Sequence, residues 1–253
     1  MEQGHDVMLQ LGEVFSEEAR MMRREFEDGP IIVGDSVGGI KKYMTFVYNR
    51  MFAALCLTGL VALVCGANDN ILRLMTGGFA MLLMIATIAI VMYLTARINS
   101  IDASKASALF WIYSALIGAS VSPVLMMYTG ESIATAFFMT ALFFGGMSLY
   151  GRFTQKNLTG MGSFMFVGLI TVVVASIANV FMGSSRLQIG LSALSVIIFC
   201  GLTAYDAQRI ALSYNDSDSD EVMKKKAICG ALSLYLDFIN IFLALLRIMG
   251  RRR

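Results

Sequence analysis

The chain has 253 residues, of which 57% are apolar and 15% are charged, and its net charge is +2 at pH 7. An ordinary soluble domain has about 25% charged residues, so this composition argues against a water-soluble protein. The small net charge and the lack of an arginine-rich strip set aside a nucleic-acid partner.

Residues 1–40 are expected to form a cytosolic tail and linker, followed by a membrane domain over residues 41–253. The charged part of the tail, residues 13–28, could form a short helix that Ser16 caps. We interpret the tail as a mobile arm, and a short amphipathic helix lying on the membrane is the alternative. The only histidine, His5, lies in this tail, which makes a zinc or haem site built on histidine very improbable.

Seven long apolar stretches follow the tail. A helix needs about 20 apolar residues to cross the hydrocarbon core of a bilayer, and only helices and closed barrels satisfy every backbone hydrogen bond there. The strict alternation that a barrel strand requires is absent. The sequence therefore predicts an all-α polytopic membrane protein whose seven spanning helices are roughly residues 44–66, 72–96, 107–127, 133–150, 162–182, 188–205 and 228–246.

The lysines and arginines of the loops predict the orientation, because such residues gather on the cytoplasmic side. They concentrate before the first span and in the second, fourth and sixth loops, as Lys41, Lys42, Arg97, Lys105, Arg152, Lys156, Arg209 and Lys224 to Lys226. This asymmetry predicts a cytoplasmic N-terminus and, after seven crossings, an external C-terminus. Arg247 and Arg251 to Arg253 oppose that placement, and a re-entrant last helix is the alternative.

Small residues in the spans predict where helices approach each other closely. Gly118, Gly145-Gly146 and Gly168 are the candidates. The four cysteines lie in or beside apolar stretches without a C-x-x-C pair, so we interpret them as packing residues; they are Cys56, Cys65, Cys200 and Cys229.

Asp237 is the most informative residue, because it lies in the apolar segment ALSLYLDFINIFLALL. An ionised aspartate in the middle of a spanning helix costs about 2.5–3.5 kcal/mol, so function is the default hypothesis for it. Ser233 precedes it by four residues and Asn240 follows it by three, so the three share one helix face, which Arg247 continues. This polar stripe predicts a last helix buried among the others, with Ser233 and Asn240 as possible pore-lining residues.

Asp206 and Arg97 are further candidates, at the predicted cytoplasmic ends of the sixth and second spans. Asp237 is expected about ten residues, or roughly 15 Å, into the last helix, so the two aspartates could lie at a similar depth. A surface ion pair with Arg209, one turn away, is an equally good interpretation of Asp206. From the residues alone, a cytoplasmic anchor is the favoured interpretation of Arg97.

Enzyme motifs do not accompany these residues. The sequence lacks G-x-S-x-G, H-E-x-x-H and a glycine-rich loop between a strand and a helix, so we expect neither a catalytic residue nor a cofactor. Intramembrane aspartyl proteases also pair two aspartates from adjacent helices. Tyr205-Asp206 matches one of their two sequence contexts, but Asp237 lacks the glycines of the other, which leaves proteolysis as the third hypothesis.

Three segments resemble the Bax inhibitor-1 family of membrane proteins, in its bacterial form. The last-helix segment ALSLYLDFINIFLALLRI is similar to the family signature, and TAYDAQRI at the end of the sixth span is similar to the other family hallmark. The segment FWIYSALIGASVSPVLMMYT in the third span is also similar. The resemblance covers residues 40–250.

This resemblance implies a seven-helix fold with a central last helix, in a bacterial inner membrane, and a pH-sensitive calcium leak. It assigns the aspartate pair of the family to Asp206 and Asp237, and by position it assigns the arginine that engages the pair to Arg97. Two like charges in contact disfavour double ionisation, so the pair is expected to titrate as a unit. These residues would form a pH-sensing latch, and the carboxylates would bind passing calcium transiently.

An interaction protein without transport of its own is the alternative function. Some bacterial relatives restrain a membrane protease, which implies a membrane-protein partner that the charged tail would contact. Deletion of residues 1–40 separates the two hypotheses. Calcium flux should survive the deletion, whereas partner binding should fail.

Overall fold

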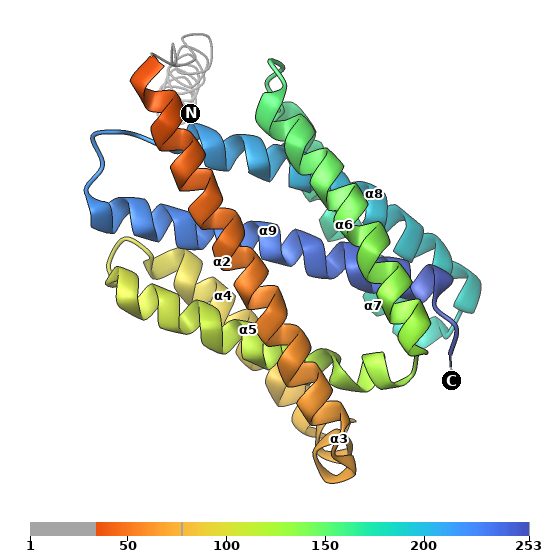
Figure 1. The fold of residues 1–253 in the computed structure, drawn as a ribbon. Coiled ribbons are helices and arrows are strands. Elements are labelled where there is room, and N and C mark those ends of the chain that lie inside the picture. The colour runs from red at the N-terminus through yellow and green to blue at the C-terminus, as the bar shows by residue number, and fades with distance from the viewer. Residues whose placement is uncertain (1–33, 77, 253) are drawn as a thin grey trace, which may run out of the picture. The chain divides into compact units, whose positions relative to one another are not determined.

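The computed structural model describes residues 34–76 and 78–252, so the predicted tail helix, Ser16 and His5 lie outside the described residues (Figure 1). The described part contains eight helices and no strand. The helices are α2 (Gly34–Gly66), α3 (Asp69–Thr76), α4 (Gly78–Arg97), α5 (Ala103–Met126), α6 (Gly130–Phe153), α7 (Thr159–Met182), α8 (Ser185–Leu212) and α9 (Asp220–Met249).

Seven of these helices, all except α3, are long and apolar enough to cross a membrane. Their outward faces are apolar, as Phe181 and Val180 show with exposed fractions of 87% and 80%. Such surfaces would associate in water, whereas lipid solvates them. The chain is therefore a multi-pass integral membrane protein, which confirms the predicted all-α class with seven spanning helices.

The second spanning segment is shorter than the sequence predicted. Its candidate span covers Phe79–Arg97, whereas the prediction began at residue 72. Residues 69–76 form the separate helix α3, because Asn68 caps it by accepting hydrogen bonds from the backbone of Asn70 and Ile71. A separate short helix keeps its charged residues out of the long apolar segment.

Helices α8 and α9 extend beyond the predicted spans, at the ends that face each other. Only residues 213–219 separate them, and Lys226 closes this turn through Asp218 at 2.6 Å and the Ser213 carbonyl at 2.9 Å. Asp206 consequently lies within α8 rather than at its end. Asp237 follows the first residue of α9 by 17 positions, or roughly 25 Å, so the predicted depth of 15 Å was too small.

Hydroxyl caps and one glycine define the other tight turns. Thr129, Ser184 and Ser219 accept backbone hydrogen bonds at the starts of α6, α8 and α9. Gly183 ends α7 with a φ of 62°, a left-handed conformation that a side chain would strain. The turns at residues 98–102, 183–184 and 213–219 pack α4 against α5, α7 against α8, and α8 against α9.

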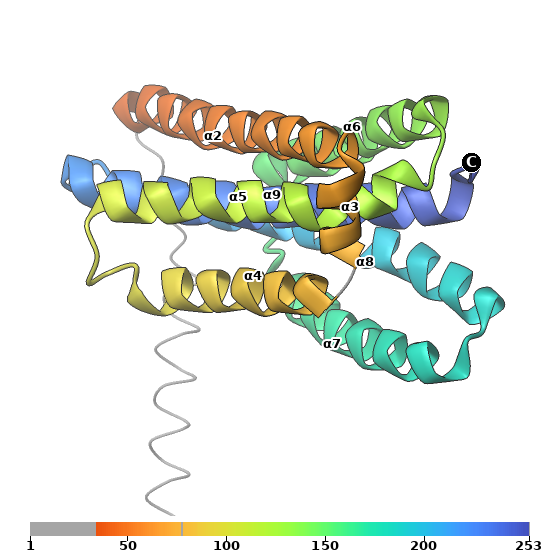
Figure 2. The ribbon, with the colours of Figure 1, turned by 90° about the horizontal axis from the view of Figure 1, so that it is seen from below.

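Helix α9 is the most buried of the seven spanning helices. In its apolar window 67% of the residues are buried, against 6–39% in the other six. It packs against α5, α6 and α8, and Figure 2 shows α2 and α6 on one side of it and α4 and α7 on the other. The central position predicted for the last helix is confirmed, and this position keeps the polar stripe of α9 away from lipid.

Glycines allow the closest helix contacts only at some of the predicted positions. A Cβ on Gly118 would lie 2.6 Å from the Thr58 carbonyl oxygen, and one on Gly168 would lie 3.1 Å from Ile198. Gly145 and Gly146 have nothing within 4 Å of an added Cβ, so the prediction was wrong for them. They lie on a face of α6 that meets no other helix there, and Gly151 of the same helix makes the close contact instead.

Candidate functional site

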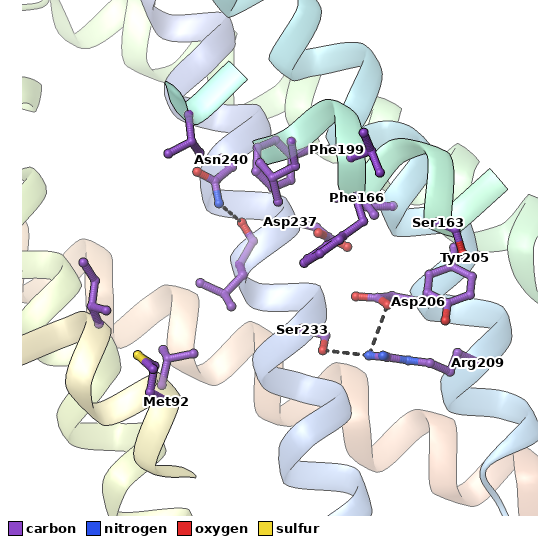
Figure 3. A pocket seen from close by; sticks show the side chains of 18 of the residues that line it. Met92, Ser163, Phe166, Phe199, Tyr205, Asp206, Arg209, Ser233, Asp237 and Asn240 are labelled. Atoms are coloured by element: carbon purple, nitrogen blue, oxygen red, sulfur yellow. Dashed lines mark hydrogen bonds and ion pairs between the residues drawn. The ribbon is translucent and has the colours of Figure 1, made fainter. Parts of the chain in front are cut away.

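A cavity of about 940 Å³ lies beside α9 and is walled by α4, α5, α7 and α8 (Figure 3). Most of the wall is apolar and includes Phe166, Phe199 and Leu236. The charged side chains and two of the polar ones gather where α8 and α9 meet. They are Asp206 and Arg209 from α8, and Ser233, Asp237 and Asn240 from α9, and the lining also includes the hydroxyl groups of Thr87, Tyr113, Ser163 and Tyr205.

Asp237 is a carboxyl buried in the membrane-spanning region. Its exposed fraction is 4%, and its oxygen Oδ2 has no hydrogen-bond partner among the described residues. Thr203 presents its hydroxyl to the carboxyl, but that hydroxyl donates its own proton to the Phe199 carbonyl at 2.7 Å. Asp237 is therefore a buried carboxyl with one oxygen left without a hydrogen bond among the described residues.

Arg209 joins the two helices at the rim of the cavity. Its Nη2 lies 3.2 Å from Asp206 Oδ1 and 3.2 Å from the Ser233 hydroxyl oxygen. The Asp206 side chain is 13% exposed, whereas that of Arg209 is 53% exposed. The ion pair considered from the sequence is thus formed, but its acidic partner is nearly buried. Arg209 connects α8 to α9 next to Asp237.

The two aspartates face the same cavity. Both line it, and Figure 3 shows the two carboxyls directed into the same space. Residues 206 and 237 share no sequence neighbourhood. The antiparallel packing of α8 on α9 brings them together.

Gly162 permits this packing on the side of α7. A Cβ at this position would lie 2.5 Å from the ring of Tyr205, the residue before Asp206. Glycine therefore lets the Tyr205 ring lie against α7, and the Arg209 guanidinium covers the same ring at 5.5 Å from its centroid. The aromatic ring thereby supports the position of Arg209.

Asn240 and Ser233 line the cavity, as the helical spacing indicated. The Asn240 side chain donates a hydrogen bond to the Leu236 carbonyl at 2.8 Å, one turn earlier in α9. Its amide oxygen is left for the cavity. The Ser233 hydroxyl accepts the hydrogen bond from Arg209.

Arg97 does not join this group in the structure. It ends α4, it does not line the cavity, and its exposed side chain makes no ion pair within residues 34–76 and 78–252. The cation beside the pair is Arg209 instead. In the sequence, Arg209 is marked only by its position three residues after Asp206. This spacing places Arg209 and Asp206 on one helix face only if the helix continues past residue 209.

The oxygen ligands of the site are few. Among the described residues, no three of His, Cys, Asp and Glu lie close enough together to hold a metal ion. Calcium in a storage site takes six to eight oxygens around one point, whereas the cavity lining has only two carboxyls, and its amide and hydroxyl groups come from five different helices beside one opposing arginine. The described residues therefore do not form a calcium storage site of that kind.

Comparisons with known proteins place this cavity in a family context. A family model described as "Inhibitor of apoptosis-promoting Bax1" matches residues 40–253, which include every residue of the cavity. The inner membrane protein YbhL of Escherichia coli strain K12 is 41% identical over 219 residues, covering 85% of this chain and 94% of that protein. Uncharacterized proteins of Rickettsia prowazekii and Caulobacter vibrioides are 43% and 38% identical, covering 85% of this chain and 92% and 90% of theirs.

Proposed function

This chain belongs to the Bax inhibitor-1 family, and from that premise we propose that it is a passive calcium leak whose opening the Asp206–Asp237 pair controls according to pH. Calcium is the substrate, and the bilayer is the partner of the seven spanning helices. The path would use the cavity between α9 and the wall formed by α4, α5, α7 and α8.

The observation that carries this proposal is the burial of Asp237 with one oxygen unpartnered inside a cavity. A carboxyl serving only structure would be expected to have both oxygens hydrogen bonded, since an unsatisfied buried group costs about 1–3 kcal/mol. A group that exchanges a proton, or meets a passing cation, needs an oxygen left open. Asp237 has such an unpartnered oxygen, which is buried in this structure and would become accessible when the path opens, and Asp206 adds a second acid on the same cavity.

The switch follows from the contacts of Arg209. With the pair singly protonated, one negative charge balances the Arg209 charge, and the arginine holds α8 and α9 together through Asp206 and Ser233. A change in protonation alters this charge balance. The contact between the helices then loosens or tightens, and the access to the cavity changes with it.

The groups around the pair decide which of them responds to pH. The titratable and charged residues lining the cavity are Asp206, Tyr205 and Arg209 of α8, Asp237 of α9 and Tyr113 of α5. The parts of α4 and α7 that line it contribute no acid or base. We assign the pH response to the two aspartates, because they are the only carboxyls in the lining.

The orientation is part of the proposal. We place the turn between α8 and α9 in the cytoplasm, because Lys224, Lys225 and Lys226 follow it directly. Asp206 and Arg209 are then nearer the cytoplasmic mouth. The relative YbhL is an inner membrane protein by name, which supports a plasma-membrane location for this chain.

A flux measurement tests the proposal. The purified full-length chain is reconstituted in liposomes that contain a calcium indicator, and the initial rate of calcium entry is recorded at several pH values. The rate should exceed that of empty liposomes and should change with pH. Parallel runs with sodium, potassium and magnesium measure selectivity. Calcium entry equal to that of empty liposomes at every pH would refute a leak.

A further inference from the structure

A second cavity, of about 410 Å³, lies between the ends of α7, α8 and α9 that are remote from Asp206. Its lining differs from that of the first cavity, because hydroxyls, amides and one arginine predominate. The polar lining residues are Ser176 and Asn179 of α7, Ser184 of the turn, Gln188, Ser192 and Ser195 of α8, and Arg247 of α9.

Helical spacing explains how these residues come together. Residues 188, 191, 192 and 195 share one face of α8, and residues 176, 179 and 180 share one face of α7. Gly183 turns the chain between them, and the Asn179 side chain accepts a hydrogen bond from the Ser184 backbone at 3.2 Å. The hairpin thus directs two polar faces at the Arg247 end of α9.

The charge of this cavity favours an anion over a cation. Its lining includes Arg247 and no carboxylate. Ser184 caps the first turn of α8, so the partial positive charge of that helix end adds to the Arg247 charge. If this cavity continued the proposed calcium path, it would need negatively charged oxygen ligands, whereas its lining is positively charged.

Two side chains in this cavity lack partners within residues 34–76 and 78–252. Arg247 is exposed and forms neither an ion pair nor a hydrogen bond with the described part of the chain. Ser192 is 3% exposed, and its hydroxyl makes no hydrogen bond to the described residues, although the neighbouring Ser195 bonds to the Leu191 carbonyl at 2.8 Å. Ser192 is thus a buried residue whose hydroxyl has no protein partner and lines a polar cavity, which indicates a ligand.

We propose that this cavity binds a phosphate group, with Arg247 as the charged anchor and Ser192 as a buried donor. The planar guanidinium matches the oxygens of a phosphate in a way that a compact ammonium does not. Arg247 lies two residues before the end of α9, where a spanning helix meets the lipid headgroups. The phosphate could belong to an acidic phospholipid or be free in solution, and the site is independent of the proposed calcium leak.

Binding measurements on the purified full-length chain in detergent test this site. The probes are inorganic phosphate, short-chain phosphatidylglycerol and short-chain phosphatidylcholine, and the readout is the dissociation constant by calorimetry. Arg247→Gln should weaken phosphatidylglycerol binding about tenfold or more, as expected when a charged hydrogen-bond partner is lost. Arg186→Gln is the matched control, because Arg186 is exposed at the same end of α8 but does not line the cavity.

The probes distinguish the two sources of phosphate. Phosphatidylglycerol binding without phosphate binding identifies a lipid headgroup, and competition between the two identifies a site that free phosphate also fills. Ser192→Ala provides a second variant that removes no hydrogen bond of the described fold, and it should also weaken binding. The proposal is overturned if neither inorganic phosphate nor phosphatidylglycerol binds, or if Arg247→Gln and Ser192→Ala bind them like the wild type. It is also overturned if Arg186→Gln weakens binding as much as Arg247→Gln does.

Discussion

Arg209 lies 3.2 Å from a carboxylate oxygen of Asp206 on its own helix, and its other contact, to the Ser233 hydroxyl, reaches across to α9. The pair is half open to solvent, since the Arg209 side chain is 53% exposed. Half-exposed ion pairs contribute about 0–1 kcal/mol. Arg209 therefore matters less for stability than for the charge beside Asp237.

Replacement of Arg209 should alter flux more than folding. Arg209→Gln leaves the Asp206–Asp237 pair without its cation, so the pH at which calcium flux changes should move, while the melting temperature in detergent stays within a few degrees of the wild type. Arg97→Gln is the matched control, because Arg97 is exposed and does not line the cavity. If Arg97→Gln moved the pH response and Arg209→Gln did not, Arg97 would be the arginine that engages the aspartate pair, as its position in the sequence suggested.

The class of fold could be predicted from the sequence because lipid leaves the backbone few choices. Seven apolar stretches of spanning length require seven helices or a barrel, and the structure has the helices. The face of the last helix could be read as well, because Ser233, Asp237 and Asn240 follow helical spacing. All three line the cavity.

The pairing of Arg209 with Asp206 was one of two interpretations of the sequence, but the place of Arg209 beside the cavity could not be predicted, because it depends on where α8 ends. The apolar stretch over residues 188–205 ends at Tyr205-Asp206, but helix α8 continues to Leu212. A spanning helix can extend beyond the hydrocarbon core of the bilayer, so the end of the apolar stretch does not mark the end of the helix. This extension turns Arg209 toward α9. Arg97 had the right position in the sequence but lies on α4, whose lining residues in the cavity are Thr87, Ile88, Val91 and Met92.

The close contact at Gly151 predicts a large difference between two glycines of α6. A Cβ on Gly151 would lie 2.0 Å from the Ala204 carbonyl oxygen of α8, and a backbone atom cannot move aside. Gly151→Ala should therefore lower the free energy of unfolding by about 1–3 kcal/mol, the usual cost of overpacking. Gly145→Ala, with nothing within 4 Å of the added Cβ, should not lower this free energy and should raise it by about 0.4–1 kcal/mol, because alanine restricts the unfolded chain.

Thermal unfolding in the same detergent compares the two glycine variants. Equal melting temperatures for Gly151→Ala and Gly145→Ala would show that α6 and α8 do not approach each other as described.

A buried hydroxyl pair should stabilise the contact between α2 and α9. The hydroxyls of Tyr235 and Thr58 lie 2.7 Å apart, and Tyr235 is 0% exposed. Tyr235→Phe should cost about 0.5–1.5 kcal/mol, the net value of one such hydrogen bond. Tyr93→Phe is the control, since Tyr93 is 51% exposed. A double-mutant cycle with Thr58→Val should be non-additive, and strict additivity would argue against the bond.

The proposed orientation predicts which loops react with a membrane-impermeant thiol reagent. Ser217→Cys lies in the turn between α8 and α9, and Glu131→Cys lies at the start of α6, at the opposite ends of the spans. In intact spheroplasts Glu131→Cys should be labelled, whereas Ser217→Cys should react only after permeabilisation. The wild-type chain controls for labelling of its own cysteines. The reverse pattern would place the N-terminus outside.

The most direct test of the account is the calcium flux of Asp237→Asn as a function of pH in liposomes. Asparagine keeps the size of the side chain but removes its titration and leaves Asp206 as the only acid of the pair, so the pH dependence of the flux should be shifted or abolished in this variant. Asp102→Asn is the control, because the Asp102 side chain is 68% exposed and pairs only with Lys105 in the described structure; it should follow the wild-type curve. A wild-type pH response in Asp237→Asn would contradict the proposed role of the aspartate pair.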